Sequence, residues 1–160
     1  MANCCAVFIL VRGKTDEDTR KILARLSEEY HKANQEGQPV YIGCKRYVSA
    51  PDVSDYRTED DKPTAKIIGG VRWGIFDEDM WAIVDWLESI AEVGYVECEQ
   101  DEPGCMVHGT YRYRDGLLTW QYLPSEYYPD DSNDDCGESF NARLNKAFER
   151  HCVTVQVGRE

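Results

Sequence analysis

The pattern of hydrophobic and polar residues along the chain predicts a protein rich in β-structure. Residues 4–13 (CCAVFILVRG) are dense in β-branched and apolar side chains, which predicts a buried strand that ends at Gly13. Two β-rich runs within 105–123 flank Asp115-Gly116, a dipeptide typical of a type I′ hairpin turn. Further strands are expected at 40–48, 65–75, 95–100 and 153–157.

Helical periodicity marks three other segments. Residues 15–34 place their apolar side chains on one face, with Thr15 as N-cap and Asp18 as its capping-box partner. The other two helices are expected over 78–92, with Asp77 as N-cap, and over 138–151.

The order of these elements indicates an α+β fold. Strand, helix, two strands, helix and strand follow one another, which is the βαββαβ order of ferredoxin-like domains. Residues 50–63 have turn composition and no period, so a long loop is expected between the second and third strands. The sequence therefore predicts one domain over residues 1–160: a ferredoxin-like antiparallel sheet with an added β-hairpin and C-terminal helix.

The composition narrows the range of functions. Of the 160 residues, 42% are apolar, which favours a packed core over a disordered acidic tail. The net charge of −12 disfavours direct binding to nucleic acid or to an anionic membrane and favours a basic partner. The apolar run 6–11 is too short for a secretory signal, and seven cysteines, an odd number, argue against a disulfide framework. We therefore expect a cytoplasmic protein with reduced cysteines.

The negative charge is concentrated in the middle of the chain. Residues 73–142 hold 17 acidic and 2 basic residues, whereas the segments before and after them are slightly positive. Like charges three or four residues apart destabilise a helix, so a solvating surface is better served by mixed acids and bases. This segregation favours a surface that acts on a partner.

Two elements in this segment, the predicted second helix and the strand after it, are each expected to place their carboxylates on one side. Those of the predicted second helix share one side with Trp81, an aromatic expected to anchor an interface, so Trp81→Ala should speed dissociation. On the next strand, Glu97 and Glu99 share a face about 6.6 Å apart, close to the spacing of phosphates in nucleic acid. The predicted partner-binding residues are Glu78, Trp81, Asp85, Glu88, Glu92, Glu97, Glu99, Asp101, Glu102, Asp130, Asp131, Asp134 and Asp135.

Metal binding and catalysis are weaker interpretations. Cys98, Cys105 and His108 lack a paired-cysteine spacing, and Cys105 and His108 point to opposite faces of a regular strand. The sequence has no P-loop, nucleophile elbow or paired-histidine zinc signature. We expect no cofactor and no catalytic residue. A small enzyme acting through a cysteine and an accessory protein with an inert acidic surface are the alternatives.

Three stretches carry a family resemblance. The opening MANCC, the segment KIIGGVRWGIFDEDMWAIVDWLE and the hairpin GCMVHGTYRYRDG resemble the YubB-type ferredoxin-like family of plasmids, phages and genomic islands. Cys4 stands where that family typically has a tryptophan, and the prolines typical after the later tryptophan are missing. The resemblance implies a ferredoxin-like fold and a mobile-element origin, and it implies no active site.

Charge and resemblance together predict an inhibitor. Mobile elements need to disarm host defence, and some anti-CRISPR and anti-restriction proteins do so by mimicking DNA. We therefore expect an acidic protein whose carboxylates imitate phosphates and occupy the basic groove of a host nucleic-acid-binding protein or CRISPR effector.

Overall fold

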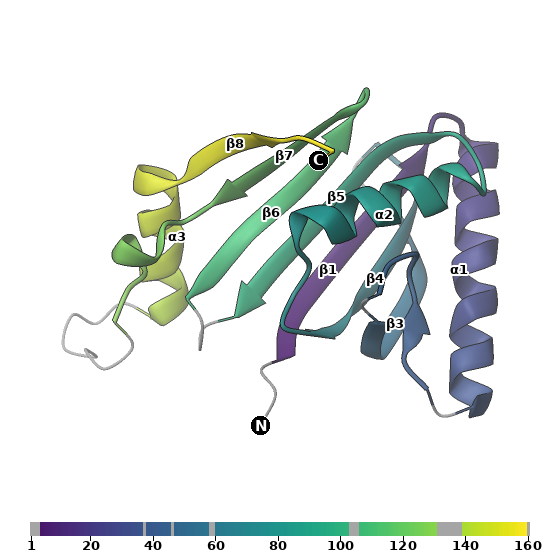
Figure 1. Cartoon of the computed structure of the whole chain (residues 1–160), viewed down its shortest axis with the longest axis horizontal. Coiled ribbons are helices and arrows are strands. Elements are labelled where there is room, and N and C mark those ends of the chain that lie inside the picture. The colour runs from purple at the N-terminus through teal and green to yellow at the C-terminus, as the bar shows by residue number, and fades with distance from the viewer. Residues whose placement is uncertain are drawn as a thin grey trace.

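The computed structural model describes residues 4–36, 38–45, 47–57, 60–102, 106–130 and 139–159. Within these ranges, eight strands form one antiparallel sheet in the order β2-β3-β4-β1-β5-β6-β7-β8 (Figure 1). The strands are β1 (Cys4–Gly13), β2 (Val40–Tyr41), β3 (Tyr47–Arg57), β4 (Pro63–Arg72), β5 (Val93–Glu102), β6 (Val107–Arg114), β7 (Leu117–Tyr122) and β8 (Val153–Val157).

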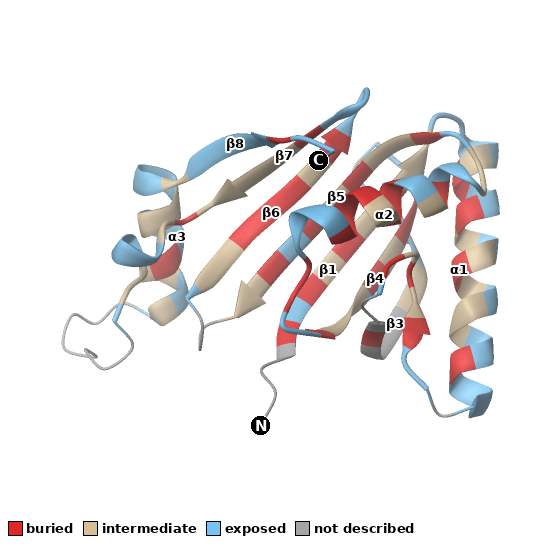
Figure 2. Ribbon diagram, viewed as in Figure 1, coloured by how far each residue is buried: buried red, intermediate tan, exposed pale blue. Residues whose placement is uncertain are grey.

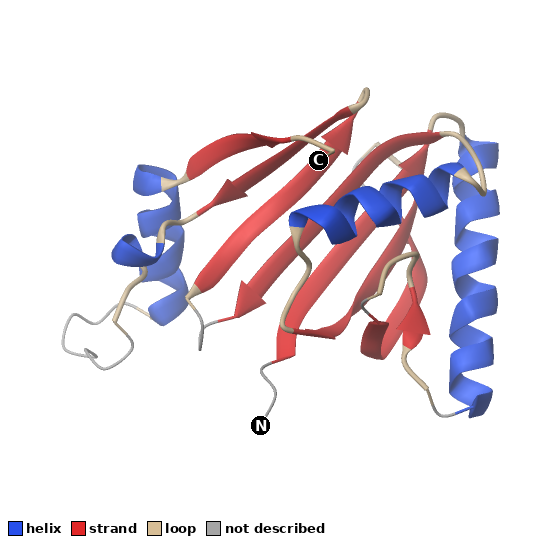
Figure 3. Ribbon diagram, in the orientation of Figure 1, coloured by secondary structure: helices blue, strands red, loops and turns tan. Residues whose placement is uncertain are grey.

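Three helices accompany the sheet (Figure 3). They are α1 (Asp16–Glu36), α2 (Asp77–Glu88) and α3 (Phe140–His151), and a short 3-10 turn, η2 (Ser125–Tyr127), precedes α3. The predicted α+β class with an antiparallel sheet is confirmed, and the sheet is larger than expected. Among the described residues, no helix combines the length and the apolar composition needed to cross a membrane.

The core lies between the sheet and the first two helices. Ile22 and Leu26 of α1 and Met80 and Leu87 of α2 belong to one buried cluster with Ile9 of β1. Figure 2 shows buried positions along α1, α2 and β1. Because both helices share a core with the same strand face, we call that side of the sheet the helix face and the other side the reverse face. Burying each large aliphatic side chain contributes about 1.5–3 kcal/mol, so this cluster holds the two helices in place.

The predicted helix cap at Thr15 and the predicted hairpin turn at Asp115-Gly116 are both present in the structure. The Asp18 amide donates to Thr15 Oγ1 over 3.1 Å, and the Thr15 amide donates to Asp18 Oδ2 over 3.3 Å, which is the predicted capping box. Asp115 and Gly116 have φ values of 53° and 81°, as a type I′ turn requires, so the β6–β7 hairpin is confirmed.

The predicted loop over 50–63 is wrong. Strand β3 runs through most of it, from Tyr47 to Arg57, and pairs with β4. The register shifts between Ser49 and Asp52, where Pro51 has no amide hydrogen to donate, so a bulge accommodates the proline within the ladder. Pairing with an apolar central strand has overridden turn composition. The predicted strand over 40–48 is accordingly split into β2 and the beginning of β3.

Helix α2 also departs from prediction at both ends. Its N-cap is Phe76, whose amide donates to Asp79 Oδ2 over 3.0 Å, and Asp77 is its first residue. The helix ends at Glu88, so Glu92 lies in the connection to β5 and does not extend the acidic side of the helix.

No helix of the described residues covers the strands β6, β7 and β8 on the side of the sheet where α2 lies. In Figure 1, α2 crosses in front of β5 and β1, whereas β6, β7 and β8 have no helix in front of them. Helix α3 packs at one end of the hairpin, where the Phe148 ring lies 5.3 Å from that of His108. His108 and Tyr111 point to opposite faces of β6, since they are three residues apart on a strand. The uncovered half of the helix face is where the site described next lies.

Candidate functional site

The acidic candidates of α2 are exposed but partly neutralised. Glu78 lies 3.2 Å from Lys45 Nζ, and the Asp85 carboxylate lies 3.0 Å from Arg159. Glu88 and Glu92 are exposed. Exposed ion pairs contribute at most about 1 kcal/mol, so a partner can displace them, yet both bases come from outside the acidic segment and reduce its field.

The acidic candidates of β5 lie on the reverse face. Glu97, Glu99 and Asp101 alternate with the buried residues Cys98 and Gln100, so they point away from α2. Glu97 contacts Arg112 Nε at 3.3 Å, and Asp101 lies 3.4 Å from His108 Nδ1. The structure therefore separates these carboxylates from those of α2 instead of joining them in one surface.

The remaining acidic candidates fall elsewhere. Glu102 has the same strand phase as Gln100 and faces the helix side. Asp130 follows η2, and its carbonyl oxygen accepts from Arg143 of α3 over 2.8 Å. Asp131, Asp134 and Asp135 lie outside the described residues.

Trp81 is not an exposed anchor, which corrects the prediction. Only 7% of it is accessible, and its Nε1–H donates to the carbonyl of Gly158 over 2.7 Å. The Arg159 guanidinium lies 4.3 Å from the ring, and Tyr113 meets it edge-on. The chain beyond β8 therefore covers the side of α2 on which Trp81 lies, and Trp81 is a structural residue.

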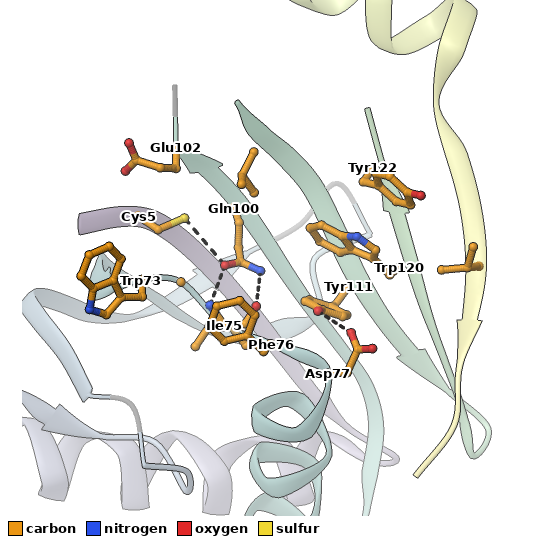
Figure 4. Close-up of a pocket in the computed structure, with 13 residues that line it drawn as sticks. Cys5, Trp73, Ile75, Phe76, Asp77, Gln100, Glu102, Tyr111, Trp120 and Tyr122 are labelled. Atoms are coloured by element: carbon orange, nitrogen blue, oxygen red, sulfur yellow. Dashed lines mark hydrogen bonds between the residues drawn. The ribbon is translucent and has the colours of Figure 1, made fainter. Parts of the chain in front are cut away.

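A cavity of about 440 Å³ opens on the uncovered half of the helix face (Figure 4). Trp73 and Phe76 stand on one side of it, and Tyr111, Trp120 and Tyr122 of the hairpin form the other (Figure 4). The remaining lining residues are Cys5, Gly74, Ile75, Asp77, Gln100, Glu102, Val107 and Val155. Its size and apolar walls are those of a small-ligand pocket.

Cross-strand pairing builds the aromatic wall. Tyr111 of β6 is directly opposite Trp120 of β7, and their ring centroids lie 4.3 Å apart. Tyr122 follows two residues later on the same face and stacks on Trp120 at 5.9 Å with nearly parallel planes. Alternate positions of one hairpin thus give a continuous aromatic surface.

Gln100 holds the side of the cavity across from the aromatic wall, the segment from Trp73 to Phe76, which we call the rim. Its side chain is buried and pairs with both backbone groups of Ile75: the Ile75 amide donates to Oε1 over 2.7 Å, and Nε2 donates to the Ile75 carbonyl over 3.0 Å (Figure 4). The Cys5 thiol also contacts Oε1, at 3.7 Å. The amide therefore holds the segment that carries Trp73 and Phe76.

Trp73 is held in a costly conformation. Its φ is +67°, a left-handed value that costs a non-glycine residue about 1–2 kcal/mol, and Gly74 after it has φ +86°. Trp73 is nevertheless 50% exposed and Phe76 47% exposed, with the Arg72 guanidinium 6.0 Å from the Trp73 ring. Strain that presents an exposed aromatic at a cavity is typical of a binding site.

The cavity is electrically negative. Asp77 and Glu102 line it, and no lysine, arginine or histidine is among the described residues of its lining. The Tyr111 hydroxyl donates to Asp77 Oδ1 over 2.7 Å, and burial, followed by that hydrogen bond and the carboxylate charge, raises the pKa of Tyr111. The phenol therefore stays neutral, and the carboxylates set the charge of the site.

Cys98, one of the described cysteines, is poorly suited to thiol chemistry. Burial raises the pKa of Cys98, which keeps that thiol protonated and poorly nucleophilic. The suggested zinc ligands do not converge: Cys98 faces the helix side, His108 faces the reverse side, and Cys105 is outside the described residues. In the described ranges, no three His, Cys, Asp or Glu side chains cluster as a metal site would need.

The raised pKa values predict a loss of stability in alkali. A group whose pKa is raised by folding stabilises the protein fully below its unfolded pKa, about 8.5 for Cys and 10 for Tyr, and this stabilisation declines above it. The free energy of unfolding should therefore fall above about pH 8.5. Between pH 7 and higher pH, the free energy of unfolding of Cys98→Ala and of Tyr111→Phe should fall less than that of the wild type. The difference should be up to about 1.4 kcal/mol per pH unit. Urea unfolding between pH 7 and 11 measures this, and parallel curves for all three proteins would contradict it.

Comparison with known proteins gives no match: no protein family and no curated protein matches this chain. Of the hairpin aromatics, Tyr111 and Tyr113 are buried and serve packing. The cavity walls formed by Trp120, Trp73 and Phe76 were not predicted from the sequence. The available signal was the alternation of aromatics on both strands of one hairpin, which marks a shared face but not what covers it.

Proposed function

We propose that this chain is a non-catalytic inhibitor that binds a basic groove of a host nucleic-acid-binding complex, such as a CRISPR effector or a restriction enzyme. The observation that carries the proposal is the negative charge of the helix face, where Asp77 and Glu102 line an aromatic cavity and α2 carries the exposed Glu78 near its start and the exposed Glu88 at its end. A cationic groove that normally holds phosphates is the complement of such a surface.

The geometry favours the helix face over the reverse face as the binding surface. Exposed apolar side chains at Trp73 and Phe76 adjoin the carboxylates there, and aromatic anchors beside charged residues are typical of protein interfaces. On the reverse face, Glu97 contacts Arg112, so its phosphate-like spacing from Glu99 is a poorer basis for mimicry.

We also propose that the segment from β1 to β5 is a ferredoxin-like unit to which the hairpin and β8 were added. The strand order β3-β4-β1-β5, the antiparallel neighbours and the placement of α1 and α2 on one face support this. The resemblance to the YubB-type family of mobile elements is consistent with it and favours an anti-defence role.

Charge reversal on α2 tests the proposed function. We expect the wild-type chain to displace a DNA probe from the purified target complex, and Glu78→Lys with Glu88→Lys to weaken this at least tenfold, because both are exposed carboxylates of the helix that the proposal sets against the basic groove. Asp85 is left unchanged, since its partner Arg159 also lies on the Trp81 ring. Fluorescence anisotropy across a panel of CRISPR effectors and restriction enzymes gives the measurement.

The matched control is the same change on the other side of the sheet. Glu97→Lys with Glu99→Lys alters the net charge equally but lies on the reverse face, so inhibition should change less than threefold. Failure of the wild-type chain against the whole panel, or equal losses for the two double variants, contradicts the proposal.

A further inference from the structure

We propose that the cavity on the helix face binds one cationic side chain, a guanidinium or alkylammonium group, from the basic partner. The inference rests on the proposed function for the source of that cation, and it assigns the cavity as the site that receives it. Three features of the cavity select this ligand chemistry: its charge, its aromatic walls and its rim.

The charge of the lining selects a cation. Asp77 and Glu102 are both at the cavity, and the lining residues within the described part of the chain include no basic side chain. Asp77 uses Oδ1 to accept from Tyr111, and a carboxylate has further acceptor positions for a second donor. The N-terminus of α2 does not attract an anion here. Its first turn carries Asp77, Glu78 and Asp79, whose negative charges offset the positive end of the helix dipole and would repel an anion.

The walls suit a cation that also has an apolar stem. Trp120 and Tyr122 stack on one another with nearly parallel rings in one wall, and the half-exposed Trp73 and Phe76 stand across from them (Figure 4). The faces of such rings attract guanidinium and ammonium groups, and tryptophan does so best. The methylene stem of arginine or lysine can lie along Phe76 and Val155 while its charged head reaches a carboxylate.

The strained Trp73 forms part of the edge of the cavity. The left-handed backbone conformation of Trp73 is unfavourable, and it leaves the indole half exposed at the cavity. The Arg72 guanidinium lies 6.0 Å from this ring and is not one of the described lining residues. Gln100 holds this rim from below through Ile75.

Short peptides test the cavity without the partner. The probes are Ac-Gly-Arg-Gly-NH₂, its lysine counterpart, and its citrulline counterpart, which keeps the shape of arginine without the charge. We expect the arginine or the lysine peptide to bind at least tenfold more tightly than the citrulline peptide by NMR titration, and their ranking identifies the head group. Equal binding of the citrulline peptide, or tighter binding of a neutral nucleoside, overturns the proposal.

Two pairs of variants locate the bound cation. Asp77→Asn with Glu102→Gln should lower affinity for the cationic peptide at least tenfold, whereas Glu99→Gln with Asp101→Asn on the reverse face should leave it within twofold. Equal effects of the two pairs contradict the assignment. Because these probes need no partner, failure of the peptides to bind rejects the cavity site and leaves the inhibitor function standing. If instead the wild-type chain binds the cationic peptide but displaces no DNA from the panel, the inhibitor function is rejected and the cavity site remains.

Discussion

Replacing Trp81 with alanine is expected to lower the free energy of unfolding by about 3–5 kcal/mol, as for other buried large aromatic residues. The change removes a side chain that is 7% accessible, its hydrogen bond to the Gly158 carbonyl and its contacts with Tyr113 and Arg159. Trp81→Phe keeps a ring for those contacts and loses the indole donor, so a smaller loss of about 1–2 kcal/mol is expected. Chemical denaturation followed by circular dichroism measures both.

Trp73→Gly is the matched control for this prediction. It also removes a tryptophan, but one that is half exposed and in a left-handed conformation that glycine adopts freely. Its stability should change by less than about 1 kcal/mol, because relief of strain offsets lost contacts. If Trp81→Ala unfolds at the same denaturant concentration as wild type, Trp81 does not hold the C-terminal segment on α2.

Replacing Gln100 with methionine is expected to destabilise the protein by about 2–4 kcal/mol and to loosen the cavity rim. Methionine has a similar shape but cannot pair with the backbone of Ile75, whose amide and carbonyl would be left buried without partners, at about 1–3 kcal/mol each. Chemical denaturation measures the stability. Hydrogen exchange measures the order of the rim, and the Ile75 amide should exchange faster in Gln100→Met than in wild type.

Gln121→Met provides the comparison on the reverse face. The Gln121 side chain contacts the Arg112 and Cys152 side chains and is half-buried, so its loss leaves no buried backbone group unpaired and should cost less than about 1 kcal/mol. Equal costs for the two methionine variants, or unchanged exchange at Ile75 in Gln100→Met, would show that Gln100 does not hold the rim.

The sequence predicted best those elements that local signals determine. The capping box at Thr15 and Asp18 and the turn at Asp115-Gly116 depend on residues a few positions apart, and both formed as expected. Strand β3 was missed because its stability comes from pairing with β4, and no local pattern encodes that partner. Helix α2 was extended too far because its acidic periodicity continues through Glu92 beyond the last helical residue.

The candidate site was beyond sequence reasoning for a related reason. A helical projection put Trp81 on the carboxylate side of α2, but the projection does not include Gly158 and Arg159, which cover that side. Strand alternation correctly pairs Glu97 with Glu99, yet which face they share depends on where α2 packs. The cavity joins residues from β1, the segment before α2, and the hairpin, so only the sheet order brings them together.

The four tryptophan indoles offer the most direct test of the central claim, which is that the aromatic, negative helix face is the binding surface. Trp73 and Trp120 line the cavity, whereas Trp86 packs on Tyr41 near Arg25, away from it. In a ¹H–¹⁵N NMR titration with the arginine peptide, the account predicts that the Trp73 and Trp120 indole signals shift in a saturable manner while the Trp86 signal stays in place. Saturable shifts at Trp86 with none at Trp73 and Trp120 would contradict it.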